Sequence, residues 1–90
     1  MHLRNPRVID QVRLTQFSAV GDGMHIEVAG SDSADPFLTF RADEQLGLQA
    51  VIHLTDRDVV IPLAELKRAI AVAEDEVHTE SFYDRQPPNA

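Results

Sequence analysis

The feature that most limits the fold of this chain is an apolar stripe at helical spacing near its C-terminus. Pro62 suits the first turn of a helix because its missing N–H would have no partner there. Apolar residues then recur at intervals of three and four, at Leu63, Leu66, Ile70, Ala73 and Val77. This spacing predicts an amphipathic helix that buries the stripe and frays beyond His78.

The segments before this helix alternate apolar and polar residues with the period of a β-strand. The clearest segments are residues 24–28, 37–42 and 48–55, and each is bounded by glycine, proline or aspartate turns. All connections are short, which favours antiparallel pairing. The order of elements predicts an α+β fold: an antiparallel β-meander of four to five strands with one C-terminal amphipathic helix packed on one face.

The first strand shows a change of apolar phase. Val12 and Leu14 alternate with polar residues, whereas the next apolar residue, Phe17, falls on the other phase. This change predicts a β-bulge near Thr15 and Gln16, or two short strands in place of one. Two glycines in the following residues 21–23 predict a tight hairpin, because glycine readily adopts positive φ.

Ninety residues suffice for one core, so we expect a single domain over 1–90, with an extended lead-in at 1–7 and a disordered tail at 85–90. The sequence has no cysteine, which excludes disulfides, cysteine-ligated metals and a thiol nucleophile. It has no long apolar run and no secretory-type N-terminus. We therefore expect a cytoplasmic protein without membrane contact.

The composition is acidic, with 15 Asp and Glu against 8 Lys and Arg, a net charge of −7. Such a charge repels nucleic acids and anionic membranes and favours a basic protein partner. The acidic residues gather toward the C-terminus, at Glu74, Asp75, Glu76 and Glu80. We predict that this cluster contacts the partner; the alternative is a solubilising surface.

The outer face of the predicted sheet is not fully polar. Phe37 and Val51 interrupt it, with Phe17 as a further candidate. An uncovered apolar face predicts self-association, here a homodimer through the sheet, or another partner. In the alternative interpretation, Phe82 and Tyr83 fold back and cover the patch, so these two residues also belong to the predicted partner-binding set.

Catalytic and metal-binding patterns are weak. His25, Glu27 and His53 share one strand face and form a zinc-type ligand set only if the second and fourth strands are neighbours. The alternative is a solvated strand face. The sequence has no nucleophile elbow and no phosphate-binding loop. We therefore predict no enzymatic activity, no catalytic or metal site, and no cofactor.

Four strands followed by a helix with a proline at its entry resemble, in order of elements, the single-stranded nucleic-acid-binding folds of the Whirly, positive cofactor 4 and Pur families. That resemblance implies bases stacked on Phe17 or Phe37. In size and charge the chain is similar to small acidic bacterial or phage proteins that neutralise a basic target, such as immunity and anti-CRISPR proteins. The leading prediction is a non-enzymatic protein-interaction module, of a neutralising or inhibitory kind; the alternative is single-stranded nucleic-acid binding.

Overall fold

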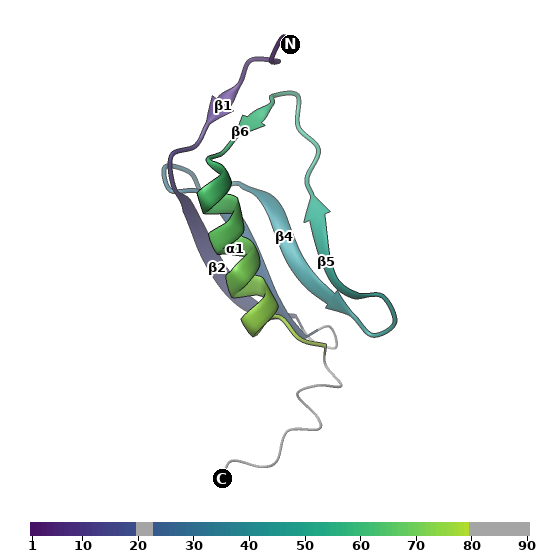
Figure 1. Cartoon of the computed structure of the whole chain (residues 1–90). Helices are drawn as coiled ribbons and strands as arrows, with labels where there is room; N and C mark the ends of the chain where they lie inside the picture. Colours follow the sequence, from purple (N-terminus) through teal and green to yellow (C-terminus); the bar gives the residue numbers. More distant parts are fainter. Residues whose placement is uncertain (20–22, 80–90) are drawn as a thin grey trace.

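The computed structural model has one helix on one face of a four-stranded antiparallel sheet, and it describes residues 1–19 and 23–79 (Figure 1). A two-stranded parallel ribbon joins the start of the chain to the segment before the helix. The predicted α+β meander with one C-terminal helix is confirmed. In chain order the elements are β1 (Arg7–Val8), β2 (Val12–Ala19), β3 (Gly23–Gly30), β4 (Pro36–Asp43), β5 (Gly47–Ile52), β6 (Val59–Val60) and α1 (Leu63–Glu76).

The core lies between the sheet and α1. Strand pairing places Ile26 opposite Phe40 and Val28 opposite Leu38, so the larger apolar residues of the central strands share the helix side. Ile26 and Val28 are fully buried, and each contributes roughly 1.5 to 3 kcal/mol of gross apolar stabilisation. The buried cluster comprises Ile9, Val12, Ile26, Val28, Leu38, Phe40, Ala42, Ala69, Ala73 and Val77.

The helix packs through Ala69, Ala73 and Val77, with Leu66 partly buried, so two members of the predicted stripe are buried as expected and two others, Leu63 and Ile70, are not. Ala69 and Ala73 are 0% exposed, whereas Leu63 is 64% and Ile70 is 39% exposed. The predicted burial of Leu63 and Ile70 is therefore wrong. Side chains as small as alanine allow the helix backbone to approach the sheet closely, and this contact sets the rotation of the helix about its axis.

The predicted β-bulge near Thr15 and Gln16 is also wrong. β2 pairs with β3 without interruption, from Val12 opposite Gly30 to Ala19 opposite Gly23. The register shift lies instead between Val28 and Ala29, where β3 meets β4. Gln16 lies on the helix side of β2 but is exposed, so a polar residue occupies a position where the alternation predicts an apolar one. The strand continues through this position without a bulge.

The turn between β2 and β3 is described only at its end. Gly23 has φ of 76°, a value that glycine adopts readily, and it begins β3. Gly21 and Asp22 lie outside the described residues, as does the predicted disordered tail at 85–90.

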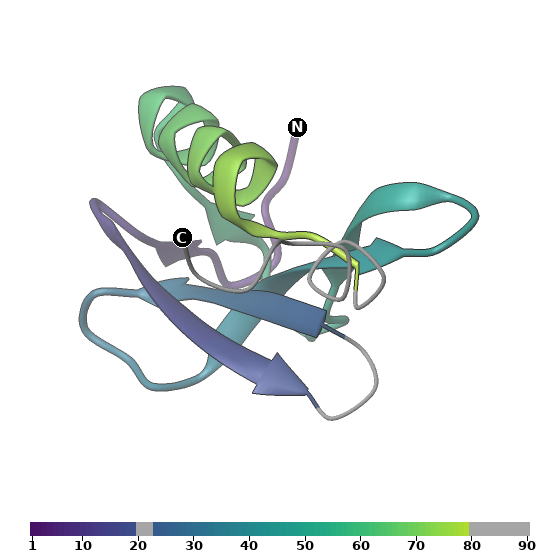
Figure 2. The ribbon, with the colours of Figure 1, turned by 90° about the horizontal axis from the view of Figure 1, so that it is seen from below.

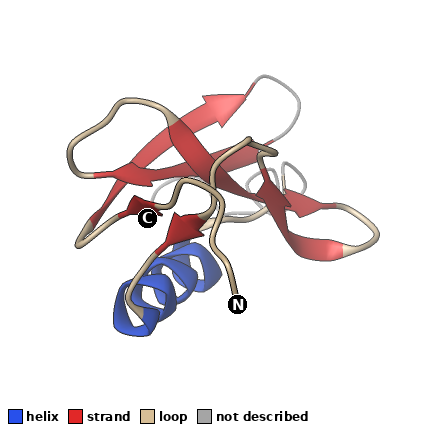
Figure 3. Cartoon of the chain, turned by 90° about the horizontal axis from the view of Figure 1, so that it is seen from above, coloured by secondary structure: helices blue, strands red, loops and turns tan. Residues whose placement is uncertain are grey.

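The predicted extended lead-in at 1–7 ends in a short strand. Arg7 and Val8 form β1, which pairs in parallel with β6. The Arg7 amide donates to the Asp58 carbonyl at 2.7 Å, and the Ile9 amide donates to the Val60 carbonyl at 2.8 Å. Figure 3 shows the helix on one side of the strands. The ribbon fixes the chain just before α1 begins.

Candidate functional site

Helix α1 covers only part of the sheet face on which it lies. It contacts β2 and β3, and the β4–β5 hairpin extends to its side (Figure 2). The helix-side residues of β4 are still buried, but the helix side of β5 is open along the flank of α1. This uncovered part of the sheet is where we place the candidate site.

An apolar groove of about 390 Å³ lies between α1 and the β4–β5 part of the sheet. Its floor includes Leu38 and Ala50, and its helix wall is formed by Leu66 and Ile70. All the residues that line it are apolar: Phe37, Leu38, Ala50, Ile52, Val59, Ile61, Leu66 and Ile70. A groove of this composition takes up apolar side chains rather than charged ones.

In the part of the chain that the structure describes, β5 forms one edge of the sheet, and no strand pairs with the backbone groups along its outer side. The His53 amide donates to the Phe37 carbonyl at 3.1 Å, so odd-numbered residues bond toward β4. Because N–H and C=O groups alternate in direction along an antiparallel strand, those of Leu48, Ala50 and Ile52 point away from β4. This outward side is a template for another strand.

No residue of β5 is charged. Edge strands of monomeric proteins commonly carry lysine, proline or an inward-pointing charge that prevents pairing with other chains. β5 has none of these residues, and Ile52, on its helix side, is 73% exposed. The edge is therefore open to association in both its backbone and its side chains.

Exposed apolar side chains concentrate around this edge. Of the eleven large apolar residues that are exposed in the described part of the chain, six lie on β5, beside it or on the helix wall of the groove. Such clustering marks an interaction surface, whereas scattered exposure does not. The six are Leu46, Leu48, Val51, Ile52, Leu54 and Ile70.

The opposite edge of the sheet, at β2, is partly capped by the helix. The Val12 amide donates to Glu65 Oε1 at 2.9 Å, and Arg68 Nη2 donates to the Val12 carbonyl at 2.8 Å. The hydrogen bond from Arg68 and that from the Val12 amide lower the pKa of Glu65. β2 also carries Arg13 and polar residues, so it resembles a protected edge far more than β5 does.

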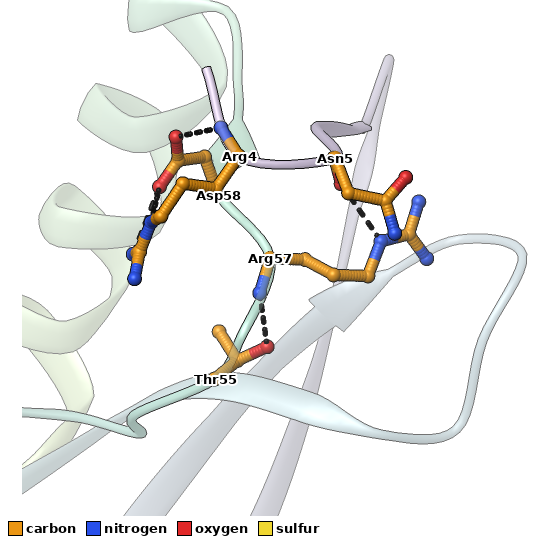
Figure 4. Close-up of polar contacts among 5 residues, drawn as sticks. All are labelled: Arg4, Asn5, Thr55, Arg57 and Asp58. Carbon is orange, nitrogen blue, oxygen red and sulfur yellow. Dashed lines mark hydrogen bonds and ion pairs between the residues drawn. The ribbon is translucent and has the colours of Figure 1, made fainter. Parts of the chain in front are cut away.

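Polar contacts join the N-terminal segment to residues 55–58, which directly precede Val59 at the groove (Figure 4). Arg4 donates its backbone N–H to Asp58 Oδ2 at 2.6 Å and its Nε to Oδ1 at 3.0 Å. The backbone hydrogen bond from Arg4 lowers the pKa of Asp58. Arg57 Nε donates to the Asn5 carbonyl at 2.9 Å. These bonds position the adjoining residue Val59, which lines the groove.

The structure places the two predicted apolar site residues of the strands, Val51 and Phe37, in different surroundings. Val51 is 39% exposed on the outer sheet face, as expected. Phe37 does not stand on that face, because it packs against the core cluster and lines the groove. The register shift between Val28 and Ala29 lies next to it and breaks the alternation that the sequence suggested.

The predicted acidic residues lie partly beside the groove. Glu74 and Asp75 are exposed in the last turn of α1, where no basic residue is present, and Glu76 is half-buried. Glu74 follows Ile70 by one helical turn, so it continues the helix wall of the groove. The remaining predicted partner-binding residues, Glu80, Phe82 and Tyr83, lie outside the described residues.

The three residues of the zinc-type alternative are separated. β3 and β5 are not neighbours, since β4 lies between them. The His25 ring meets the Phe17 ring edge-on with centroids 5.1 Å apart, and His53 Nε2 lies 2.8 Å from Thr39 Oγ1. In the described ranges, no group of three or more His, Cys, Asp or Glu residues is arranged to hold a metal ion.

Comparisons with profiles of protein families, with curated proteins and with solved structures gave no match to this chain. The resemblance to the Whirly, positive cofactor 4 and Pur families is thus one of element order. Helix α1 has 14 residues, and the described part of the chain has no helix with the length and apolar character needed to span a bilayer.

Sequence reasoning missed the groove and the open edge. The available signal was the uncharged sequence of β5, GLQAVI, in a chain whose charged content is 26%. Its position at the sheet edge follows from the strand order, which the sequence alone left open.

Proposed function

We propose that this chain is a non-enzymatic protein-interaction module that binds an extended polypeptide strand along β5. The observation that carries the proposal is an uncharged edge strand placed next to an apolar groove. Strand addition at an exposed sheet edge is a general mode of peptide recognition. Main-chain hydrogen bonds supply affinity, and pockets for alternate side chains supply specificity.

The geometry specifies what such a ligand offers. Its backbone bonds to the outward groups of Leu48, Ala50 and Ile52, and the side chains on the helix side enter the groove. Because side chains alternate along a strand, the ligand has apolar residues at every second position. Each side chain that becomes fully buried contributes roughly 1.5 to 3 kcal/mol before the cost of ordering the ligand.

The acidic charge of the chain supports a partner with basic residues beside this apolar segment. Glu74 is exposed one helical turn beyond Ile70 of the groove wall, and the net charge is −7. Charges at the rim of an interface accelerate and orient association more than they strengthen it. A neutralising or inhibitory protein that occupies a basic target surface would work in this way.

The alternative function, single-stranded nucleic-acid binding, rests on the outer face of the sheet. Phe17 is 38% exposed and packs edge-on against His25 on that face, so an aromatic platform is present. Two arginines share the face, but Arg13 donates to the Ser33 carbonyl and Arg41 to Gln49 Oε1. These bonds hold both guanidinium groups in intramolecular contacts, which favours the protein-binding proposal.

Selection from a random peptide library on the immobilised chain tests the proposal. We expect enrichment of extended peptides with alternating apolar residues and a basic flank. Binding of the selected peptides should fall by about tenfold or more with Ile52→Lys, which places a charge in the groove. Ser18→Lys is the matched control, because Ser18 is exposed on β2, at the opposite edge of the sheet.

The outcome that contradicts the proposal is a set of peptides whose binding is equal for both variants, or no enrichment at all. A fluorescent single-stranded oligonucleotide measured in the same buffer tests the alternative. If oligonucleotide binding is lost with Phe17→Ala and kept with Ile52→Lys, the result supports nucleic-acid binding on the outer face instead.

A further inference from the structure

We infer that the strand that β5 takes up is β5 of a second copy of this chain, in an antiparallel pair around a two-fold axis at Ala50. This inference rests on the proposed function and names the partner of that site. The two four-stranded sheets would then join into one sheet of eight strands. Both helices would lie on the same face, because a two-fold axis perpendicular to a sheet keeps its faces.

The strand is complementary to itself in this register. Antiparallel pairing around Ala50 places Leu48 of each copy opposite Ile52 of the other, and Leu46 opposite Leu54. The outward backbone groups of Leu48, Ala50 and Ile52 then face one another, as hydrogen-bonded pairs require. Ile52 is 73% and Leu54 is 99% exposed in the single chain. The pairing would therefore cover the most exposed apolar residues of this edge.

The charges around β5 suit an antiparallel pair of like copies. β5 carries no charge, so the two strands can approach although each chain carries −7. The acidic turn with Asp43 and Glu44 precedes the strand, and Asp56, Arg57 and Asp58 follow it, with Asp58 paired to Arg4. Antiparallel pairing places the Asp43 and Glu44 turns of the two copies at opposite ends of the paired strands and so keeps the two acidic turns apart. Parallel pairing would place them side by side.

The groove gives a second reason for a like copy. Each groove is open on the side of β5, and its floor includes Ala50 and Ile52. In the pair the two floors meet at the two-fold axis and form one apolar surface between two helices. Glu74 of each copy stays exposed one helical turn beyond Ile70.

Light scattering coupled to size-exclusion chromatography, with sedimentation equilibrium, tests the inference. One six-residue strand from each copy is a small interface, so we expect a dimer with a Kd on the order of 10 μM. Raising the salt concentration should strengthen it or leave it unchanged, because the copies repel and the paired strands are neutral. A chain that stays monomeric at several hundred micromolar, roughly 30-fold above that Kd, overturns the inference.

Charge substitution at the axis tests the register. Ala50→Lys and Ala50→Glu each place two like charges opposite one another, so each variant alone should dimerise at least tenfold more weakly. Mixed together, with one variant labelled with ¹⁵N, they should form a heterodimer that native mass spectrometry identifies. Ala50 is exposed in the single chain, and circular dichroism checks that both variants fold. A wild-type dimer that neither variant weakens overturns the register.

The failure of this inference differs from the failure of the proposed function. A monomer whose peptide binding falls with Ile52→Lys keeps the function and excludes the second copy as the partner. A monomer that becomes dimeric when Phe82 and Tyr83 are both changed to alanine shows that the chain's own C-terminal segment occupies the edge, which also overturns the inference.

Discussion

The rotation of α1 can be tested with two neighbouring residues. Ala69 is fully buried against the sheet, whereas Ile70 is 39% exposed and lines the groove. Replacing Ala69 with leucine forces extra carbon atoms into a packed contact, which destabilises the fold by about 1 to 3 kcal/mol. Replacing Ile70 with alanine removes a partly exposed side chain and improves helix propensity, so we expect a cost of only about 1 kcal/mol.

Urea denaturation followed by circular dichroism measures both changes. A domain of this size has an m-value of about 1 kcal/mol per M, so Ala69→Leu should lower the midpoint by about 2 M and Ile70→Ala by about 1 M. Ala71→Leu is the matched control, because Ala71 is exposed on the same helix, and its effect should stay within about 0.5 kcal/mol. If Ile70→Ala is the more damaging change, the helix has the rotation that the leucine and isoleucine stripe suggested, and our account of the packing fails.

Two further predictions concern pH and a turn. The pKa values of Glu65 and Asp58 lie below their ordinary 4.5 and 3.8, so their stabilisation is present above those values and is lost as pH falls through the lowered ones. Urea denaturation repeated at decreasing pH should show the midpoint fall in this range, and the double variant Glu65→Gln with Asp58→Asn should show a smaller fall. An equal fall in the wild type and in the double variant contradicts this prediction. Gly47 has φ of 82° with nothing near its Cβ position, so Gly47→Ala should cost about 1 to 2 kcal/mol in the same assay, and Gly47→Asn less. Equal midpoints for wild type and Gly47→Ala would show that the turn does not need this conformation.

Local patterns in the sequence were sufficient to predict the elements and their class. The alternation in residues 24–28, 37–42 and 48–55 corresponds to β3, β4 and β5, and the helix begins after Pro62 as expected. These features depend on neighbours in the chain, which is why the sequence expresses them. The same patterns were misleading where a polar residue occupies an exposed helix-side position, as Gln16 does.

Contacts between distant segments were not predictable in the same way. The pairing of β1 with β6 joins residues more than fifty positions apart through two short strands that carry no periodic signal. The caps from Glu65 and Arg68 to Val12 depend on where the helix lies over the sheet. Ala69 and Ala73 form the closest helix contact because they are small, and hydrophobic periodicity gives more weight to large residues such as Ile70.

The open groove follows from the dimensions of the elements. A helix with its side chains is about 10 Å wide, and neighbouring strands lie about 4.8 Å apart, so one helix covers roughly two strands of a sheet. With α1 over β2 and β3, the helix-side residues of β4 are still buried, whereas Leu48, Ala50 and Ile52 of β5 are left exposed. In a chain that functions alone, positions 48, 50 and 52 would face water and would be expected to carry polar residues. Leucine, alanine and isoleucine occupy them instead, while the exposed helix-side positions of β2 at 16 and 18 are glutamine and serine. This contrast between the two edges of one sheet is the reason to look for a partner at β5 and not at β2.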